Sequence, residues 1–300
     1  MPEETSVRPV DPSHRGRAFA GEGFVARCGR FAMRHRPALF GAAVCAAAAV
    51  AVFIGPPLAP VPPNAVHVSA MMHPPSAAWP LGTDDLGRDL LSRLLAGGRV
   101  SLGVGLAATL AGACLGVPAG LASGFWRAWP DAVLMRVMDL LFAFPTMVLA
   151  VAIVGVLGPS LVNATLAIAV VATPRFARLV RGQVLSVREL EFIEAARAMG
   201  APAARIVARH VFPNVLGLVV VQATLTVSFA ILTEASLSFL GLGVQPPTAS
   251  WGSMLRYGYP YLDRAPWISL VPGIAIMTTI LGFNLLGDGV RDALDPRLQR

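Results

Sequence analysis

Lysine is absent from this 300-residue chain, and all 24 of its basic residues are arginine. A P-loop nucleotide site needs a lysine that reaches the β- and γ-phosphates of the nucleotide. A Schiff-base mechanism needs a lysine amine as its nucleophile. Both kinds of chemistry are therefore excluded, and any ATP hydrolysis that serves this protein has to come from a separate subunit.

The other reactive side chains form no catalytic pattern. The histidines occur in no H-E-x-x-H sequence, which disfavours a membrane zinc protease, and no G-x-S-x-G motif is present. Cys28, Cys45 and Cys114 fall in a basic tail and in two apolar stretches, so no disulfide is implied. We expect no catalytic residue, no metal ligand and no cofactor bound by this chain.

Charged residues are scarce, at 14%, whereas hydrophobic residues make up 55% of the chain. The mean hydropathy of +0.64 is too high for a soluble domain of this length. Six apolar stretches can be interpreted as bilayer spans, namely 38–55, 100–124, 137–157, 160–178, 215–239 and 267–287. The fourth is the weakest, because Asn163, Thr173 and Pro174 erode its ends. We predict an all-α polytopic membrane protein with six transmembrane helices.

The first apolar stretch is interpreted as a retained anchor. Residues 1–36 before it are largely polar and no A-x-A cleavage site follows it cleanly, which disfavours a signal peptide. The predicted organisation is a cytoplasmic basic tail (1–36), a first transmembrane anchor (37–56), an extracytoplasmic loop (57–96), a main membrane domain (97–288) that contains a cytoplasmic loop (179–214), and a cytoplasmic tail (289–300).

The arginines predict the orientation. Nineteen of them fall in the two tails and in the loops at 125–136 and 175–214, all of which share one side of a six-span protein. The remaining five are Arg88, Arg93, Arg99, Arg256 and Arg264. The positive-inside rule then places both termini in the cytoplasm of a bacterium, with the protein in its inner membrane. A basic inner surface that faces anionic membrane lipid accounts for the net charge of +7, so no nucleic-acid partner is needed.

Small residues recur at steps of four along the second apolar stretch. The row consists of Gly112, Gly116, Gly120 and Gly124. This spacing places them on one helix face, where another helix can approach closely. The row predicts either packing within one bundle or a surface against a partner or a moving helix.

Acidic residues are nearly absent from the apolar stretches. Asp139 and Asp288 lie near predicted cytoplasmic ends, and Glu234 lies near the outer end of the fifth stretch. Ion-coupled transporters usually carry acidic relays near the middle of the membrane, so a self-contained secondary transporter is disfavoured. Two interpretations of Glu234 stay open: a hydrogen-bonded or water-facing residue at the outer rim, or a residue that lines or gates a pathway.

Residues 186–214 form a charged, amphipathic segment between two apolar stretches. Ser186 and Glu189 form a capping box, which predicts a helix from Ser186 to about Met199. Gly200 predicts a left-handed turn into a second helix. One face of the first helix carries Phe192, Ala195, Ala196 and Met199. Two such helices in water predict a docking surface for a partner.

This segment resembles the loop motif of ABC-importer permeases. Glu194, Ala195 and Ala196 precede Gly200 by the spacing of that motif, and His210-Val211-Phe212-Pro213 stands where the general pattern has Ile-x-Leu-Pro. Three further stretches, LGTDDLGRDLLSRLLAGGRVSL, LTEASLSFLGLGVQPP and GDGVRDALDPR, resemble the second permease of dipeptide, oligopeptide and nickel importers. The resemblance covers about residues 81–297.

The resemblance implies a type I ABC-importer permease fold. It also implies three kinds of partner: a homologous second permease, two ATP-binding-cassette ATPase subunits that carry ATP and magnesium, and a solute-binding protein. The residues implied to contact the ATPase are Phe192, Glu194, Ala195, Ala196, Met199, Gly200 and Pro213. The solute would be a peptide, nickel or a related small molecule. A secondary transporter and an integral membrane enzyme are the alternative functions.

Overall fold

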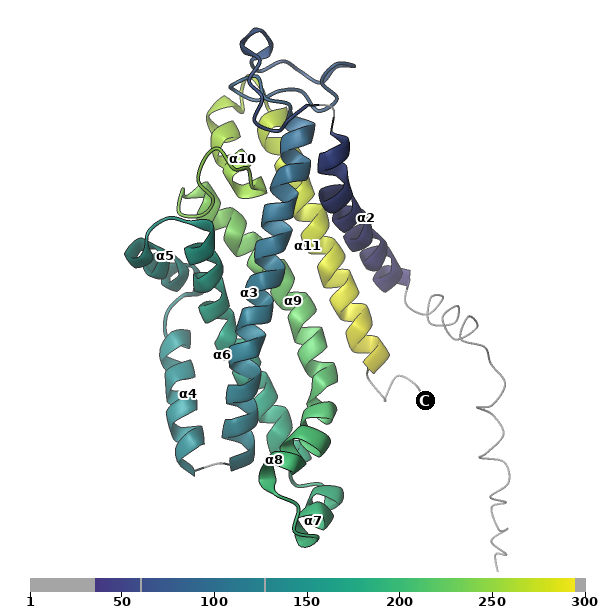
Figure 1. Cartoon of the computed structure of the whole chain (residues 1–300), viewed down its shortest axis with the longest axis vertical. Helices are drawn as coiled ribbons and strands as arrows, with labels where there is room; N and C mark the ends of the chain where they lie inside the picture. Colours follow the sequence, from purple (N-terminus) through teal and green to yellow (C-terminus); the bar gives the residue numbers. More distant parts are fainter. Residues whose placement is uncertain (1–35, 60, 127, 295–300) are drawn as a thin grey trace, which may run out of the picture. The chain divides into compact units, whose positions relative to one another are not determined.

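The computed structural model describes residues 36–59, 61–126 and 128–294; most of these residues are helical, and none of them forms a strand. Apart from Arg36, they belong to one compact unit, Pro37–Arg300. The helices are α2 (Arg36–Leu58), α3 (Leu90–Trp126), α4 (Ala128–Phe142), α5 (Thr146–Leu157), α6 (Leu161–Val187), α7 (Glu191–Ala198), α8 (Ala203–Ile206), α9 (Phe212–Phe239), α10 (Trp251–Gly258) and α11 (Trp267–Leu294) (Figure 1).

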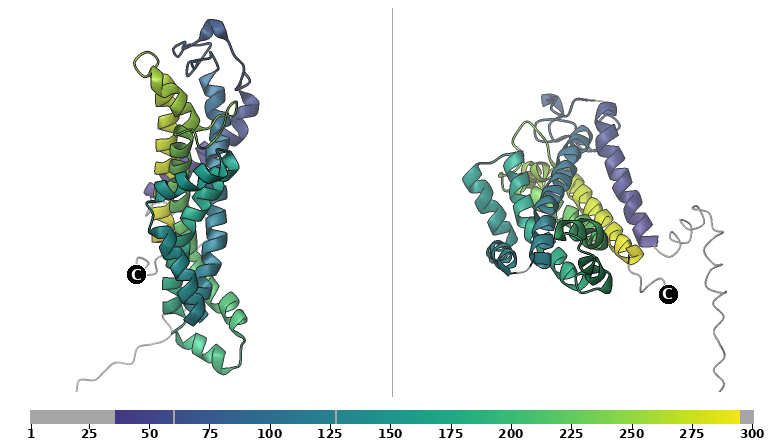
Figure 2. Two further views of the ribbon diagram at one scale, coloured as in Figure 1. Left: turned by 90° about the vertical axis from the view of Figure 1, so that its left-hand side faces the viewer. Right: turned by 60° about the horizontal axis from the view of Figure 1, so that its bottom comes forward.

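Long helices α3, α6, α9 and α11 make up the centre of this unit (Figure 1). We call its two ends the α7 end and the α10 end, after the short helices found there. Helices α3, α6 and α11 run from the α10 end toward the α7 end, whereas α9 runs back. Helix α3 packs most extensively on α6. We call residues 188–202, which contain α7, the α7 segment. Figure 2 shows this segment projecting beyond the end of α3.

The predicted count of six spans is only partly recovered. Four helices among the described residues are long and apolar enough to cross a membrane, or five if α4 and α5 are counted as one broken span. Pro145 lies between α4 and α5, and the two helices meet at 93° where the sequence predicted one continuous span over 137–157. Helix α6 has 27 residues but carries Arg175, Arg178 and Arg181, so it is not among the apolar spans.

The glycine row of α3 lies against α6 of the same chain. A Cβ atom added at Gly112 would lie 3.0 Å from Ala172 Cβ, and one at Gly116 would lie 2.5 Å from the carbonyl oxygen of Thr173. The corresponding contacts of Gly120 and Gly124 are also shorter than 3.0 Å. Because glycine has no side chain, the backbones of α3 and α6 approach each other here more closely than any other residue would allow.

Helix α2 is fastened to α3 by one arginine. Pro56 and Pro57 end α2 and have no N–H groups, so the carbonyl groups four residues earlier receive no helical hydrogen bond. Arg99 of α3 donates to both of these oxygens, at 2.7 Å to Val52 and 2.6 Å to Phe53. A charged donor thus satisfies two carbonyl groups that the prolines leave without partners.

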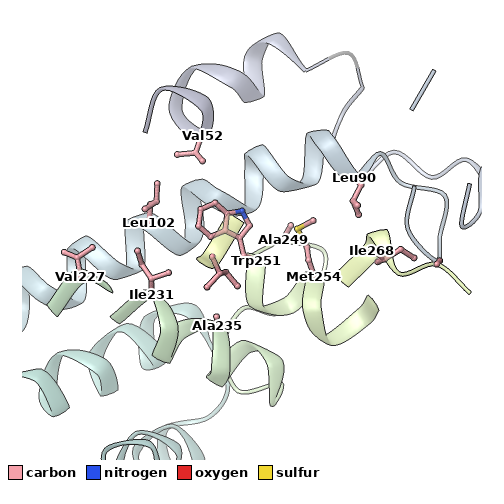
Figure 3. Close-up of a cluster of buried hydrophobic side chains, with 12 residues drawn as sticks. Val52, Leu90, Leu102, Val227, Ile231, Ala235, Ala249, Trp251, Met254 and Ile268 are labelled. Carbon is pink, nitrogen blue, oxygen red and sulfur yellow. The ribbon is translucent and has the colours of Figure 1, made fainter. Parts of the chain in front are cut away.

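An apolar cluster at the α10 end joins five helices. Trp251 of α10 lies between α3 and α9, beside Val52 of α2 and Ile231 of α9 (Figure 3). Its indole nitrogen donates a 3.0 Å hydrogen bond to the Leu94 carbonyl of α3. The sequence placed residues 57–96 in one extracytoplasmic loop, but the end of that stretch, from Leu90 onward, forms the first turns of α3.

Candidate functional site

The candidate site at the α7 end begins where α6 ends. The predicted helix start at Ser186 is wrong, because α6 continues through Ser186 to Val187 and α7 begins only at Glu191. Val184 and Val187 are buried in the apolar cluster at this end, so packing extends α6 beyond the capping signal. Tertiary contact outweighs the local preference at this position.

Helix α7 is held by two inward-facing side chains. Ile193 and Ala196 are buried against α6 and the start of α9. Ala196 therefore packs inward and does not belong to the outward face on which the sequence placed it. The other residues predicted on α7, namely Phe192, Glu194, Ala195 and Met199, are exposed, and Met199 is 81% exposed. Their side chains form an outward surface at the tip of the unit.

Gly200 ends α7 in a left-handed conformation, with φ of +77°. The Ala201 amide donates to the Ala196 carbonyl at 3.1 Å, and the Gly200 amide donates to the Arg197 carbonyl at 2.9 Å. This pair of hydrogen bonds is the Schellman motif, in which the residue after the helix needs a positive φ. The predicted left-handed turn at Gly200 is confirmed.

The second predicted helix is continuous with the next membrane span. Residues 203–239 form one helical run, made of α8, a π-helical turn over Val207–Val211, and α9. Pro213 is exposed and lies inside this run, directly after the π-helical turn. Helix α7 is therefore joined to the helical run that contains α9 by the turn over residues 199–202.

Two arginines connect the α7 segment to α3. Arg188 donates to the Gly124 and Phe125 carbonyl oxygens at 3.2 and 2.9 Å, and so caps the end of α3. Arg197 of α7 lies 5.5 Å from the centre of the Phe125 ring. The sequence analysis did not identify Arg188 or Ile193 as important. The sequence did contain an indication for Arg188. The last turn of α3 has no basic residue of its own, so a basic residue from elsewhere could be expected at its terminal carbonyl groups.

Glu234 lies at the opposite end and is fully buried, with 0% of its surface exposed. Ser101 of α3 donates to its Oε2 at 2.9 Å, and Ser238 donates to its Oε1 at 2.7 Å. The Trp251 amide donates to Ser101 Oγ at 3.2 Å. Glu234 therefore joins α9, α3 and the start of α10, and in this conformation its carboxylate contacts no open pathway.

The described residues contain no group of histidine, cysteine, aspartate and glutamate side chains that could hold a metal ion. A helical unit with apolar spans and an exposed, anchored helix at one end is consistent with a membrane subunit that acts with other chains. Comparison with known proteins gives the same class.

Residues 116–300 match the family described as "Binding-protein-dependent transport system inner membrane component". The dipeptide transport system permease protein DppC of Alkalihalophilus pseudofirmus is 49% identical over 225 residues, which are 75% of this chain and 74% of that protein. The glutathione transport system permease protein GsiD of Pectobacterium atrosepticum is 46% identical over 226 residues, 75% of each chain.

The chain belongs to this family of inner-membrane transport components and is a permease subunit of an ABC importer. A solved structure titled as the MetNI methionine ABC transporter in inward-facing conformations matches with a TM-score of 0.55 at 22% identity, over 67% of this chain and 96% of that chain. This likeness shows the type I permease fold. The chain is thus a multi-pass bacterial membrane protein, and a self-contained secondary transporter gains no support.

Proposed function

We propose that this permease imports peptides, with short peptides as its solutes. The observation that carries the proposal is its 49% identity, over three quarters of the chain, to a protein named as a dipeptide permease. A second relative is named for di- and tripeptides and a third for glutathione, which is itself a tripeptide. The names of these relatives therefore favour peptides over nickel as the class of solute.

The α7 segment couples the permease to an ATPase. Its exposed residues Phe192, Glu194, Ala195 and Met199 provide the contact surface, and Gly200 fixes the angle at which α7 leaves the bundle. Ile193 and Ala196 anchor the other side of α7 to the permease. Pushing on α7 then displaces α9 through the turn over residues 199–202, because the helix is continuous from residue 203 onward.

The complete importer contains four kinds of chain. The permease pairs with a homologous permease, so that one pathway forms between two halves. Two ATPase subunits bind ATP and magnesium, since this chain has no lysine for a P-loop. A solute-binding protein delivers the solute at the α10 end. The α7 end, the N-terminus and the C-terminus lie in the cytoplasm, in keeping with the excess of arginines toward that side.

Reconstitution of the complex into liposomes tests this function. ATP-dependent uptake of radiolabelled dialanine, in the presence of the solute-binding protein, is the expected result. The purified permease alone should hydrolyse no ATP. Uptake of nickel with no uptake of dialanine or glutathione would contradict the solute class, whereas uptake without any ATPase subunit would contradict the coupling to ATP.

A further inference from the structure

A charged groove lies between α4 and α6, in the half of the unit toward the α7 end. It encloses a cavity of about 530 Å³ that is lined by Asp131, Ala132, Met135, Arg136, Asp139, Arg178, Arg181 and Gly182. Two ion pairs cross it: Arg181 binds both oxygens of Asp131 at 2.6 and 2.7 Å, and Arg178 binds Asp139 at 2.6 Å. The Arg178 guanidinium also lies 4.1 Å from the centre of the Phe142 ring.

The Arg178–Asp139 ion pair, which we call the inner pair, lies well inside the apolar part of the unit. Phe176 and Val180 of α6 face Gly116 and Gly120 of α3, so Arg178 is level with Pro118. From that level α3 continues without a charged residue to Trp126. These eight residues span about 12 Å at 1.5 Å per residue. The hydrocarbon core of a bilayer is about 30 Å thick, which places the pair at a depth where charge is costly.

Both partners of the inner pair are nevertheless half exposed, with 47% of the Arg178 side chain and 51% of the Asp139 side chain accessible. The face of α4 that points away from the groove is apolar and exposed over the same depth, through Val133, Val137 and Leu140. Helix α4 therefore offers one face to lipid and a different, charged face to a polar medium. Charged side chains at such a depth face a bundle interior or a water-filled cavity.

We propose that the α4–α6 groove lines the inner part of the water-filled translocation pathway, and that Arg178 binds the carboxylate of the passing solute there. Arg178 releases Asp139 and takes the solute carboxylate in its place. This exchange gives Arg178 a new ion pair in place of the old one, and the released Asp139 carboxylate, which is 51% exposed, is then solvated by the water of the groove. The role of Arg178 rests on the proposed function, because it requires a solute that carries a carboxylate, as every unmodified peptide does.

Cysteine accessibility tests the pathway without any assumption about the solute. Cys28, Cys45 and Cys114 are first replaced by serine, and single cysteines are introduced in the assembled complex in lipid nanodiscs. Ala132→Cys and Gly182→Cys probe the groove, and an added Cβ at Gly182 meets no atom within 4 Å. Val137→Cys is the matched control on α4, since it is exposed but lies outside the groove.

A membrane-impermeant, positively charged methanethiosulfonate reagent should modify both groove cysteines at least tenfold faster than Val137→Cys. Equal rates at the three positions, or no modification in the groove, would overturn the assignment. Slow modification of all three positions would also overturn it, because lipid or the partner permease would then cover the groove.

Paired variants test the role of Arg178 through dialanine uptake. Arg178→Gln should raise the dialanine concentration for half-maximal uptake at least tenfold. Asp139→Asn frees Arg178 from its internal partner and should lower that concentration or leave it unaltered. Equal impairment by both variants would show that the pair acts only as a structural bridge, and would overturn carboxylate binding. Absence of uptake in the parent complex would instead refute the proposed function, while the accessibility result would stand.

Discussion

Substitution of Gly200 is the sharpest perturbation of the α7 segment, because it alters the backbone and nothing else. The added Cβ would meet no atom within 4 Å, so there is no steric clash with the rest of the protein. The residue is held at φ +77°, which L-residues with side chains rarely adopt. A β-branched residue there costs about 1–3 kcal/mol. A cost of that size lowers the population of the native turn, relative to other conformations of the segment, by about 5- to 150-fold.

We therefore predict that Gly200→Val leaves the permease inserted in the membrane but weakens its association with the ATPase and abolishes transport. Gly200→Asn should keep most of the activity, since asparagine tolerates the left-handed region better than other residues do. Gly155→Val is the matched control: Gly155 lies in helix α5, and its added Cβ also meets no atom within 4 Å. Glu194→Ala should have a smaller effect, because a single exposed charged contact is worth little.

The assay is ATP-dependent uptake into vesicles that contain equal amounts of each variant, together with co-purification of the ATPase subunit. The expected order of uptake is parent, then Gly200→Asn, then Gly200→Val, with Gly155→Val equal to the parent. A Gly200→Val variant that transports at the parental rate would refute the coupling role of the turn. Equal losses in Gly200→Val and Gly200→Asn would show that the positive φ is not the cause.

Four further predictions concern stability, three of them measured by thermal unfolding in detergent and one by proteolysis. Gly116→Leu should destabilise the permease by at least about 1–3 kcal/mol, because its Cβ would meet α6 backbone at 2.5 Å, whereas Gly103→Leu, which points into open space on the same helix, should have no effect. Glu234→Ala should cost about 1–3 kcal/mol by leaving two buried hydroxyl donors unpaired, and an unchanged midpoint would contradict the network. Arg99→Gln should loosen α2, detected as faster proteolysis of the chain near α2, while a parental cleavage rate would contradict the cap. Burial raises the pKa of Asp85, so the stability associated with its protonated form is present at acid pH and lost as the pH rises through the folded-state pKa; Asp85→Asn should therefore unfold at a higher temperature than the parent at neutral pH and show no gain at acid pH.

The sequence predicted the helices that local chemistry determines. Hydropathy located α2, α3, α9 and α11, and Gly200 was correctly assigned to a left-handed turn. The break between α4 and α5 was missed, although a proline disfavours a helical conformation in the residue before it and Pro145 follows Phe144 directly. Hydropathy averages over a window, and Pro145 is too small a part of that window to register.

The remaining errors arise from contacts between residues far apart in the chain. Ser186 has the local signature of a helix start, but α6 continues past it because Val184 and Val187 are buried against α9. The caps supplied by Arg99 and Arg188 join residues 46 or more positions apart. No periodicity in one segment contains such information, so these contacts could be found only in the folded structure.

Cross-linking at Met199 tests the central claim most directly. This residue is 81% exposed on α7, so a cysteine placed there does not disturb the permease. In the assembled complex, a short bifunctional maleimide should join Met199→Cys to a cysteine on the surface of the ATPase subunit, and bound ATP should change the yield. The matched control is Val68→Cys, which is 73% exposed in the loop before α3. A cross-link from Val68→Cys with none from Met199→Cys would contradict the account.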